Sequence, residues 1–252
     1  MNASTPSRPF LSHGLGLGLG MTLASALALL PFAARAQDPE GRVYAPGPFE
    51  RLEIAGSAQL RLVQGPRDQV FIAGDAELQK DVSVELLNDK LLIRPSGSWK
   101  FWNSQRLQVD VSMRQLRQLV ISGAADLRAA EPVRAQRLAI HISGAGQVRF
   151  DDLAAEQLSF GISGSGEGLL KGQVQDLNLQ VTGKGKLLAD QLRANQATVA
   201  ISGIGQAQLW VTDELRVSVS GIGTVEYWGA PDVKRRTSGL ARVNALGEKP
   251  PR

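Results

Sequence analysis

The sequence predicts an all-β protein, a single-stranded β-helix (β-solenoid) with coils of about 20 residues. Three observations predict this fold. A short glycine motif recurs at nearly constant spacing, apolar residues alternate with polar ones on both sides of each copy, and helical periodicity is absent between the copies. Because a unit of this size cannot bury its apolar face alone, successive units are expected to stack on one another.

The repeated motif is Ile or Val, then Ser or Thr, then Gly-x-Gly. Its close copies occupy residues 142–146, 162–166, 181–185, 201–205 and 219–223, and looser copies occupy 54–58, 121–125 and 237–241. From residue 121 onward the copies begin 21, 20, 19, 20, 18 and 18 residues apart. A propeller blade needs about twice this period, and the hexapeptide period of a left-handed β-helix is absent.

Stacking should place matching residues of neighbouring coils about 4.8 Å apart. Ile142 and its equivalents then form an internal aliphatic ladder. The hydroxyl residues that follow form a ladder at the corner, where they can bond to one another or to the backbone: Ser143, Ser163, Thr182, Ser202 and Ser220. The glycines are expected to supply positive φ angles for a sharp corner. About ten coils would give a rod roughly 50 Å long.

Residues 49–111, before the regular repeats, show strand alternation with weaker punctuation. We interpret them as irregular first coils of one β-helix domain that spans 49–246, with the regular repeats at 112–246. A separate small β domain is the alternative. Residues 37–48 are expected to be an N-terminal linker, and residues 247–252 a C-terminal tail.

Residues 1–36 have the organisation of a secretory signal peptide. Arg8 precedes an apolar run that opens with glycine alternating with leucine, and Ala34-Arg35-Ala36 matches an A-x-A cleavage pattern. We expect export to the periplasm or the cell surface, with cleavage after Ala36; an uncleaved anchor is the alternative. Cleavage removes two of 28 basic residues and none of 24 acidic ones, so the net charge falls from +4 to +2. No integral membrane segment is expected in the mature chain.

The composition excludes several kinds of chemistry. The absence of Cys rules out disulfides, thiol nucleophiles and cysteine-bound metal clusters, and two His leave little for zinc or haem. His141, the only His after the signal peptide, lies between two inward positions and is expected at the surface. When outward positions are aligned from coil to coil, no carboxylates come together, so we predict no catalytic residue, no metal site and no cofactor. The small positive charge is not typical of nucleic-acid binding.

The repeated motifs, together with an opening Phe49-x-x-Leu52-x-Ile54-x-Gly56, resemble a bacterial family called putative auto-transporter adhesin, head GIN domain. The resemblance covers roughly residues 49–246. It implies an exported, right-handed, single-stranded β-helix, and it brings no catalytic residues.

Two aromatic clusters are the candidate ligand platform. Trp210 and Trp228 each follow the second glycine of their copy by five residues, which would place both rings on adjacent coils as a flat apolar surface for a sugar ring or a partner's side chain. Trp99, Phe101 and Trp102 form the second cluster. Either cluster could instead shield or cap the solenoid.

These features predict a non-enzymatic, exported, adhesin-like module that binds or scaffolds at the cell envelope, with a glycan or an envelope protein as partner. A polysaccharide-acting β-helix lyase or hydrolase is the alternative, and it predicts a carboxylate cluster in a lateral groove. A structural or regulatory protein without a ligand is the third interpretation. Lys234-Arg235-Arg236 is interpreted as protection of the open end of the solenoid, with binding of acidic envelope polymers as the alternative.

Overall fold

The computed structural model describes residues 40–96 and 107–250, which belong to one compact unit formed by residues 38–252. The unit confirms the predicted β-solenoid. Its strands are β1 (Gly41–Tyr44), β2 (Arg51–Ile54), β3 (Ser57–Gln64), β4 (Gln69–Ala73), β5 (Val82–Leu87), β6 (Lys90–Pro95), β7 (Leu107–Met113), β8 (Gln118–Ile121), β9 (Ala124–Ala129), β10 (Val133–Ile142), β11 (Ala145–Ile162), β12 (Ser165–Val181), β13 (Lys184–Ile201), β14 (Ile204–Val219), β15 (Ile222–Trp228), β16 (Asp232–Thr237) and β17 (Leu240–Ala245). One short helix, α1 (Ala76–Lys80), joins β4 to β5.

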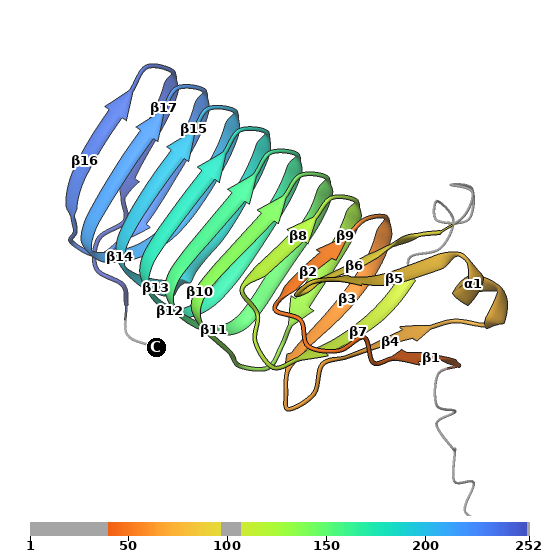
Figure 1. Cartoon of the computed structure of the whole chain (residues 1–252). Coiled ribbons are helices and arrows are strands. Elements are labelled where there is room, and N and C mark those ends of the chain that lie inside the picture. Colours follow the sequence, from red (N-terminus) through yellow and green to blue (C-terminus); the bar gives the residue numbers. More distant parts are fainter. Residues whose placement is uncertain (1–39, 97–106, 251–252) are drawn as a thin grey trace, which may run out of the picture. The chain divides into compact units, whose positions relative to one another are not determined.

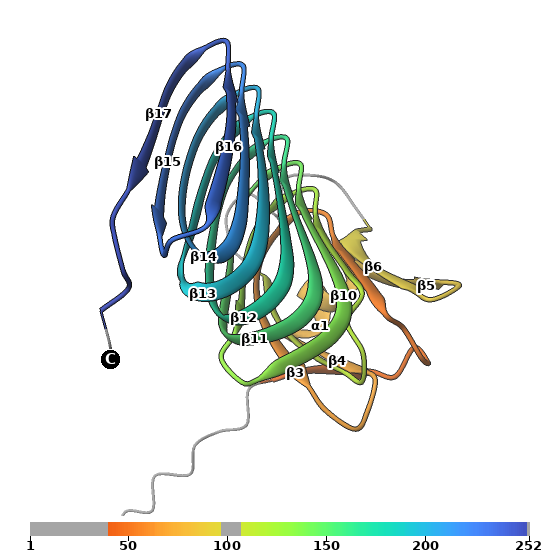
Figure 2. The same cartoon turned by 90° about the vertical axis from the view of Figure 1, so that its left-hand side faces the viewer.

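The coils stack in the register that the repeats predict. Strands β10 to β15 lie side by side and parallel, as Figures 1 and 2 show. Ile142 lies opposite Ile162, and the same row continues through Val181 and Ile201 to Val219. Every member of this row is almost completely buried. The aliphatic ladder is therefore the core of the solenoid, and hydrophobic burial together with interstrand hydrogen bonds holds the coils together.

The corner glycines differ from the sequence prediction. In the close copies of the motif their φ angles are not positive. The first glycine is required because the coils approach closely: a Cβ on Gly164 would lie 2.0 Å from the carbonyl oxygen of Gly144. The second glycine points inward, so that a Cβ on Gly185 would lie 2.7 Å from a methyl of Ile162. The glycine motif is therefore required by the short distance between stacked coils, and not by a special turn conformation.

The first part of the chain does not form consecutive coils. Strand β2 lies between β6 and β8, and β3 lies between β7 and β9, all in parallel. The layer of β6 and β7 therefore lies outside the layer of β2 and β3, although it comes later in the sequence. The outer edge of β7 pairs antiparallel with β4, which pairs with β1, and the outer edge of β6 pairs with β5.

Antiparallel pairing explains why the solenoid has about six turns instead of the ten expected. The strand alternation of residues 49–111 is present, but part of it belongs to hairpins that finish the N-terminal edge. The boundaries predicted for the linker, the domain and the tail stay predictions.

The C-terminal edge is finished differently. Strands β16 and β17 form the last coil, at the blue end of Figure 1, and pair only with β14 and β15 within the described residues. Arg235 lies opposite Val217, an inward position, and Thr237 lies opposite Val219. A further coil would bury the charge of Arg235 without a partner, so this residue opposes continued stacking. That observation supports the interpretation of the basic triplet as edge protection.

Candidate functional site

A groove of about 1230 Å³, here called the lateral groove, runs across several coils on one outer face. It is lined by residues 114–117, 134–139 and 154–157, and by parts of the next two coils. Ala135, Ala139, Ala154 and Ala155 lie among its longer polar side chains. Because an alanine ends at its Cβ, these positions leave the surface hollow between arginine, glutamine and asparagine side chains.

One row of outward residues crosses this groove and continues beyond it. Strand register places its members opposite one another on successive strands: Arg134, Ala154, Gln173, Arg193, Trp210 and Trp228. Residues directly opposite in a parallel ladder point to the same side of the sheet. At about 4.8 Å a step, the row spans about 24 Å. It therefore joins the predicted tryptophan pair to a polar groove in one continuous surface, which we call the groove row.

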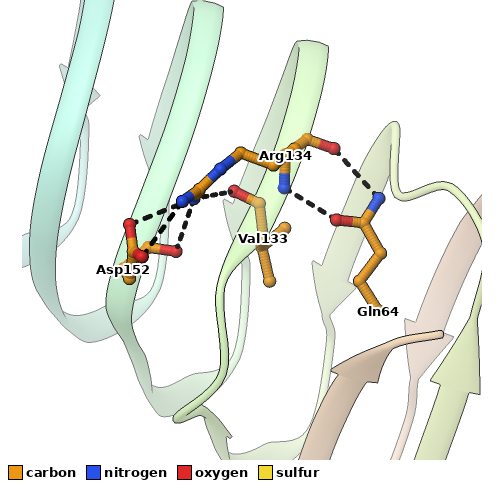
Figure 3. A network of polar contacts seen from close by, with 4 residues as sticks. All are labelled: Gln64, Val133, Arg134 and Asp152. Carbon is orange, nitrogen blue, oxygen red and sulfur yellow. Dashed lines mark hydrogen bonds and ion pairs between the residues drawn. The ribbon is translucent and has the colours of Figure 1, made fainter.

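A polar network holds Arg134, the residue at the N-terminal end of the groove row (Figure 3). The amide of Gln64 accepts a hydrogen bond from the backbone N–H of Arg134 at 2.7 Å and donates one to the carbonyl of Arg134 at 3.0 Å. It also donates to the carbonyl of Arg114 at 3.0 Å. The guanidinium of Arg134 binds Asp152 through two nitrogens, at 3.0 and 3.1 Å. This bond to Asp152 raises the pKa of Arg134. The network ties β3, β10 and β11 together and keeps Arg134 in one orientation.

Some of the arginines that line the groove form ion pairs with carboxylates, and others do not. Arg114 pairs with Asp68 at 2.6 Å, and Arg117 pairs with Glu50 at 2.8 Å. Within the described part of the chain, no carboxylate pairs with Arg137 or Arg193. These two guanidiniums keep their donors available, and planar donors of this kind bind hydroxyls and carboxylates.

Amide side chains extend the polar surface between the free arginines. Asn195 donates to Gln175 on the neighbouring coil at 2.9 Å, which orders both amides. Gln157 and Gln173 also line the groove. Amides both donate and accept, so the groove offers both kinds of hydrogen-bonding group to a hydroxylated polymer.

Trp210 and Trp228 lie in register on β14 and β15, as the sequence predicts, and both are half-buried. The Nζ of Lys249 lies 4.9 Å from the centroid of the Trp228 ring and 3.0 Å from Asp190. Backbone hydrogen bonds from Leu246 to Tyr227 and from Gly229 to Gly247 hold the C-terminal segment beside β15. Residues 246–250 therefore partly cover the aromatic end of the groove row.

The same count of five residues after the second glycine gives Asp190 on the coil before Trp210, but Asp190 does not lie opposite Trp210. A register shift between Ala189 and Arg193 bulges the intervening residues, so Trp210 lies opposite Arg193. No residue pattern marks this bulge, because the glycine motifs determine the register only near the corners. The groove row was missed for that reason, although all its residue types are visible in the sequence.

The remaining predicted residues have different places. The hydroxyl row is exposed along the corner; Ser143 donates to the carbonyl of Ile121 at 3.4 Å, and Ser163 lies 3.2 Å from the Nε2 of His141. His141 is exposed, as predicted. Trp99, Phe101 and Trp102 lie outside the described residues. Whether any of these residues binds a ligand stays a prediction.

The described residues hold no group of three or more His, Cys, Asp or Glu side chains placed to bind a metal ion. Where a carboxyl pKa is shifted, it is lowered: a hydrogen bond from Arg149 lowers the pKa of Asp151, and one from Lys234 lowers that of Glu214. Separately, no helix of residues 40–96 or 107–250 is long and apolar enough to cross a membrane.

The chain belongs to the family described as putative auto-transporter adhesin, head GIN domain, whose model matches residues 48–231. No match is found among curated proteins. The resemblance stated from the sequence is thereby confirmed.

Three crystal structures of bacterial proteins share the fold. A putative adhesin from Bacteroides fragilis is similar over 84% of this chain and 98% of its own, with 20% identity and a TM-score of 0.79. A putative adhesin from Parabacteroides distasonis has 19% identity and a TM-score of 0.64, over 83% and 97% of the two chains. One from Parabacteroides merdae has 17% identity and a TM-score of 0.63, over 84% and 97%. At these identities the likeness concerns the fold alone.

Proposed function

We propose that this protein is exported and binds an extended glycan of the cell envelope along the groove row, without acting on it chemically. The observation that carries the proposal is the groove row itself. Over about 24 Å it aligns the amide of Gln173 and the free guanidinium of Arg193 with two aromatic rings, beside the other amides and Arg137 of the lateral groove. Aromatic faces stack on the apolar faces of sugars, while planar donors bind their hydroxyls and acids. Family membership and the export signal predicted at residues 1–36 support this proposal.

Non-enzymatic binding is favoured over glycan cleavage. Glycoside hydrolysis needs one carboxylic acid whose pKa is raised and a second carboxylate close by. In the described residues, every resolved carboxyl shift is downward, and Glu156 is the one carboxylate that lines the lateral groove. Asp152, which is bound by Arg134, is not among the residues that line the groove.

A glycan array probed with the purified protein, followed by calorimetric titration of any oligosaccharide found, tests the proposal. Arg193→Ala and Trp210→Ala should each weaken binding about tenfold or more, because each removes a direct contact. Arg61→Ala is the matched control, since Arg61 is an exposed arginine that does not line the groove. Binding that survives both groove variants, or an array without any ligand, would reject the proposal and favour the ligand-free structural interpretation.

A further inference from the structure

A row of large apolar side chains is exposed at the corner of the last coils, away from the groove row. Ile204, Ile222 and Leu240 occupy the middle position of their glycine motifs and lie opposite one another on β14, β15 and β17. They are 53%, 52% and 75% exposed. They are half of the large apolar side chains that stand exposed in the described residues, the others being Val43, Leu87 and Leu246.

This apolar character is confined to the C-terminal coils. The same row holds Ala124, Ala145, Ser165 and Lys184 on the preceding coils. Neither stacking nor the corner requires a large apolar residue there, because small and polar ones serve elsewhere in the row. Aligned exposed aliphatic side chains on neighbouring strands mark a contact surface.

Positive charge surrounds the same corner. Residues 234–244 contain four basic residues and no acid. Lys234 pairs with Glu214, but Arg235, Arg236 and Arg242 form no ion pair within the described part of the chain. Arg236 lies two residues before the corner and Arg242 two residues after Leu240, both at outward positions. The apolar row thus ends between two free guanidiniums.

We infer that this corner, Ile204, Ile222 and Leu240 with Arg236 and Arg242, docks on the surface of an anionic phospholipid bilayer. Aliphatic side chains that project from an exposed corner suit insertion among acyl chains at the headgroup boundary. The flanking arginines would bind lipid phosphates, and the anionic surface would attract the whole basic end. The corner hydroxyls Ser202, Ser220 and Ser238 lie beside the apolar row and can bond to headgroup oxygens. An acidic glycan would account for the arginines alone and leave the apolar row without a partner.

Docking at this corner is independent of the proposed function, because it uses the corner at the start of β14 and β15, away from the tryptophan pair, and no residue of the groove row. Solenoid coils are rigidly stacked, so a molecule held at its last corner would still present the lateral groove along its side. A variant that loses membrane docking should therefore keep glycan binding, and a groove variant should keep membrane docking.

Co-sedimentation with vesicles tests the inference. The purified protein is mixed with vesicles of phosphatidylglycerol and phosphatidylcholine in equal parts, or of phosphatidylcholine alone. We expect binding to the anionic vesicles only, weakening as salt is raised. The double variant Ile222→Ser/Leu240→Ser should bind at least tenfold more weakly, because it removes two aliphatic side chains that docking would bury in the bilayer. Arg236→Gln/Arg242→Gln should lose about fivefold for each arginine.

Two control variants match these changes. Ala145→Ser alters the same row on an earlier coil, and Arg61→Gln removes an arginine far from the corner; both should bind within about twofold of the unchanged protein. Failure of the protein to bind anionic vesicles overturns the inference. So does unchanged binding by the Ile222→Ser/Leu240→Ser variant, since that result would show attraction to any polyanion, an acidic glycan included. Circular dichroism of each variant establishes that it is folded.

Discussion

Replacement of the first corner glycine should open the stack, whereas replacement of the second should not. In Gly164→Ala the new Cβ would lie 2.0 Å from the Gly144 carbonyl oxygen and 2.3 Å from that of Ser143. Ordinary carbon–oxygen contacts between strands are about 3.3 to 3.6 Å, so the two coils must separate by more than about 1 Å. Both obstructing atoms belong to the backbone, which cannot rotate away as a side chain would.

The magnitude follows from the contacts that this separation breaks. Overpacking costs about 1 to 3 kcal/mol. The N–H of Ser165 donates to Gly144 at 2.8 Å and that of Gly164 to Ile142 at 3.3 Å, and losing one or both adds about 1 kcal/mol each. Gly164→Ala should therefore lower the free energy of unfolding by about 2 to 5 kcal/mol.

Gly166→Ala is the matched comparison within the same motif. Its Cβ would meet the side chain of Ile142, with two methyl carbons at 3.0 Å and the Cβ at 3.2 Å, and Ala125 and Ala241 already occupy this row on other coils. Its cost should stay below about 1 kcal/mol, because alanine also restricts the unfolded chain. Urea unfolding followed by circular dichroism measures both variants. A Gly164→Ala protein as stable as Gly166→Ala would refute the argument that the first glycine is set by close coil approach.

Three further predictions concern the C-terminal segment, the loss of stability at low pH and the C-terminal edge of the solenoid. Lys249→Ala should uncover Trp228 and increase acrylamide quenching of tryptophan fluorescence, because the lysine lies 4.9 Å from that ring; unchanged quenching would show that the segment leaves the ring open. Arg149 lowers the pKa of Asp151, so this carboxylate stabilises the fold above its unfolded pKa, and the contribution disappears as pH falls through the lower folded pKa. Asp151→Asn should cost less than about 1 kcal/mol at pH 6, a difference that shrinks toward zero below about pH 4 in thermal melts at several pH values; a pH-independent difference would contradict this. Arg235→Val should extend the inward aliphatic row that includes Val217 and promote end-to-end association in sedimentation velocity runs. The outward change Arg236→Val should not promote association. An Arg235→Val protein with the same association state as the unchanged protein would oppose the edge-protection role.

Sequence periodicity predicted the solenoid well, because a glycine motif with fixed neighbours carries both the coil length and the register near each corner. Ile162 and Ile201 are buried where the repeat placed them. The conformational role given to the glycines was wrong, since close approach and positive φ favour the same residue type. The order of layers at the N-terminal end was also out of reach, because alternation in β4 and β5 is the same for parallel and antiparallel pairing.

The candidate site was predictable only in part. Trp210 and Trp228 follow the glycine motifs closely, before any change of register, so counting from the glycines aligned them correctly. Arg193 lies beyond a bulge whose position no residue pattern marks, and its place beside Trp210 emerges only from strand pairing. The pairing of Arg134 with Asp152 likewise depends on two coils meeting at the rounded bend, far from any motif.

The groove row, the apolar row at the last corner and the aliphatic core all require that matching residues of successive coils lie one above another. Pulsed electron paramagnetic resonance measures this directly, because a chain without cysteine can carry two spin labels at chosen sites. Ser143→Cys and Ser220→Cys label exposed corner positions four coil steps apart. In-register stacking at about 4.8 Å a step predicts one narrow distribution of label distances near 19 Å, widened only by the label side chains. A broad distribution, or one centred beyond about 30 Å, would contradict in-register stacking.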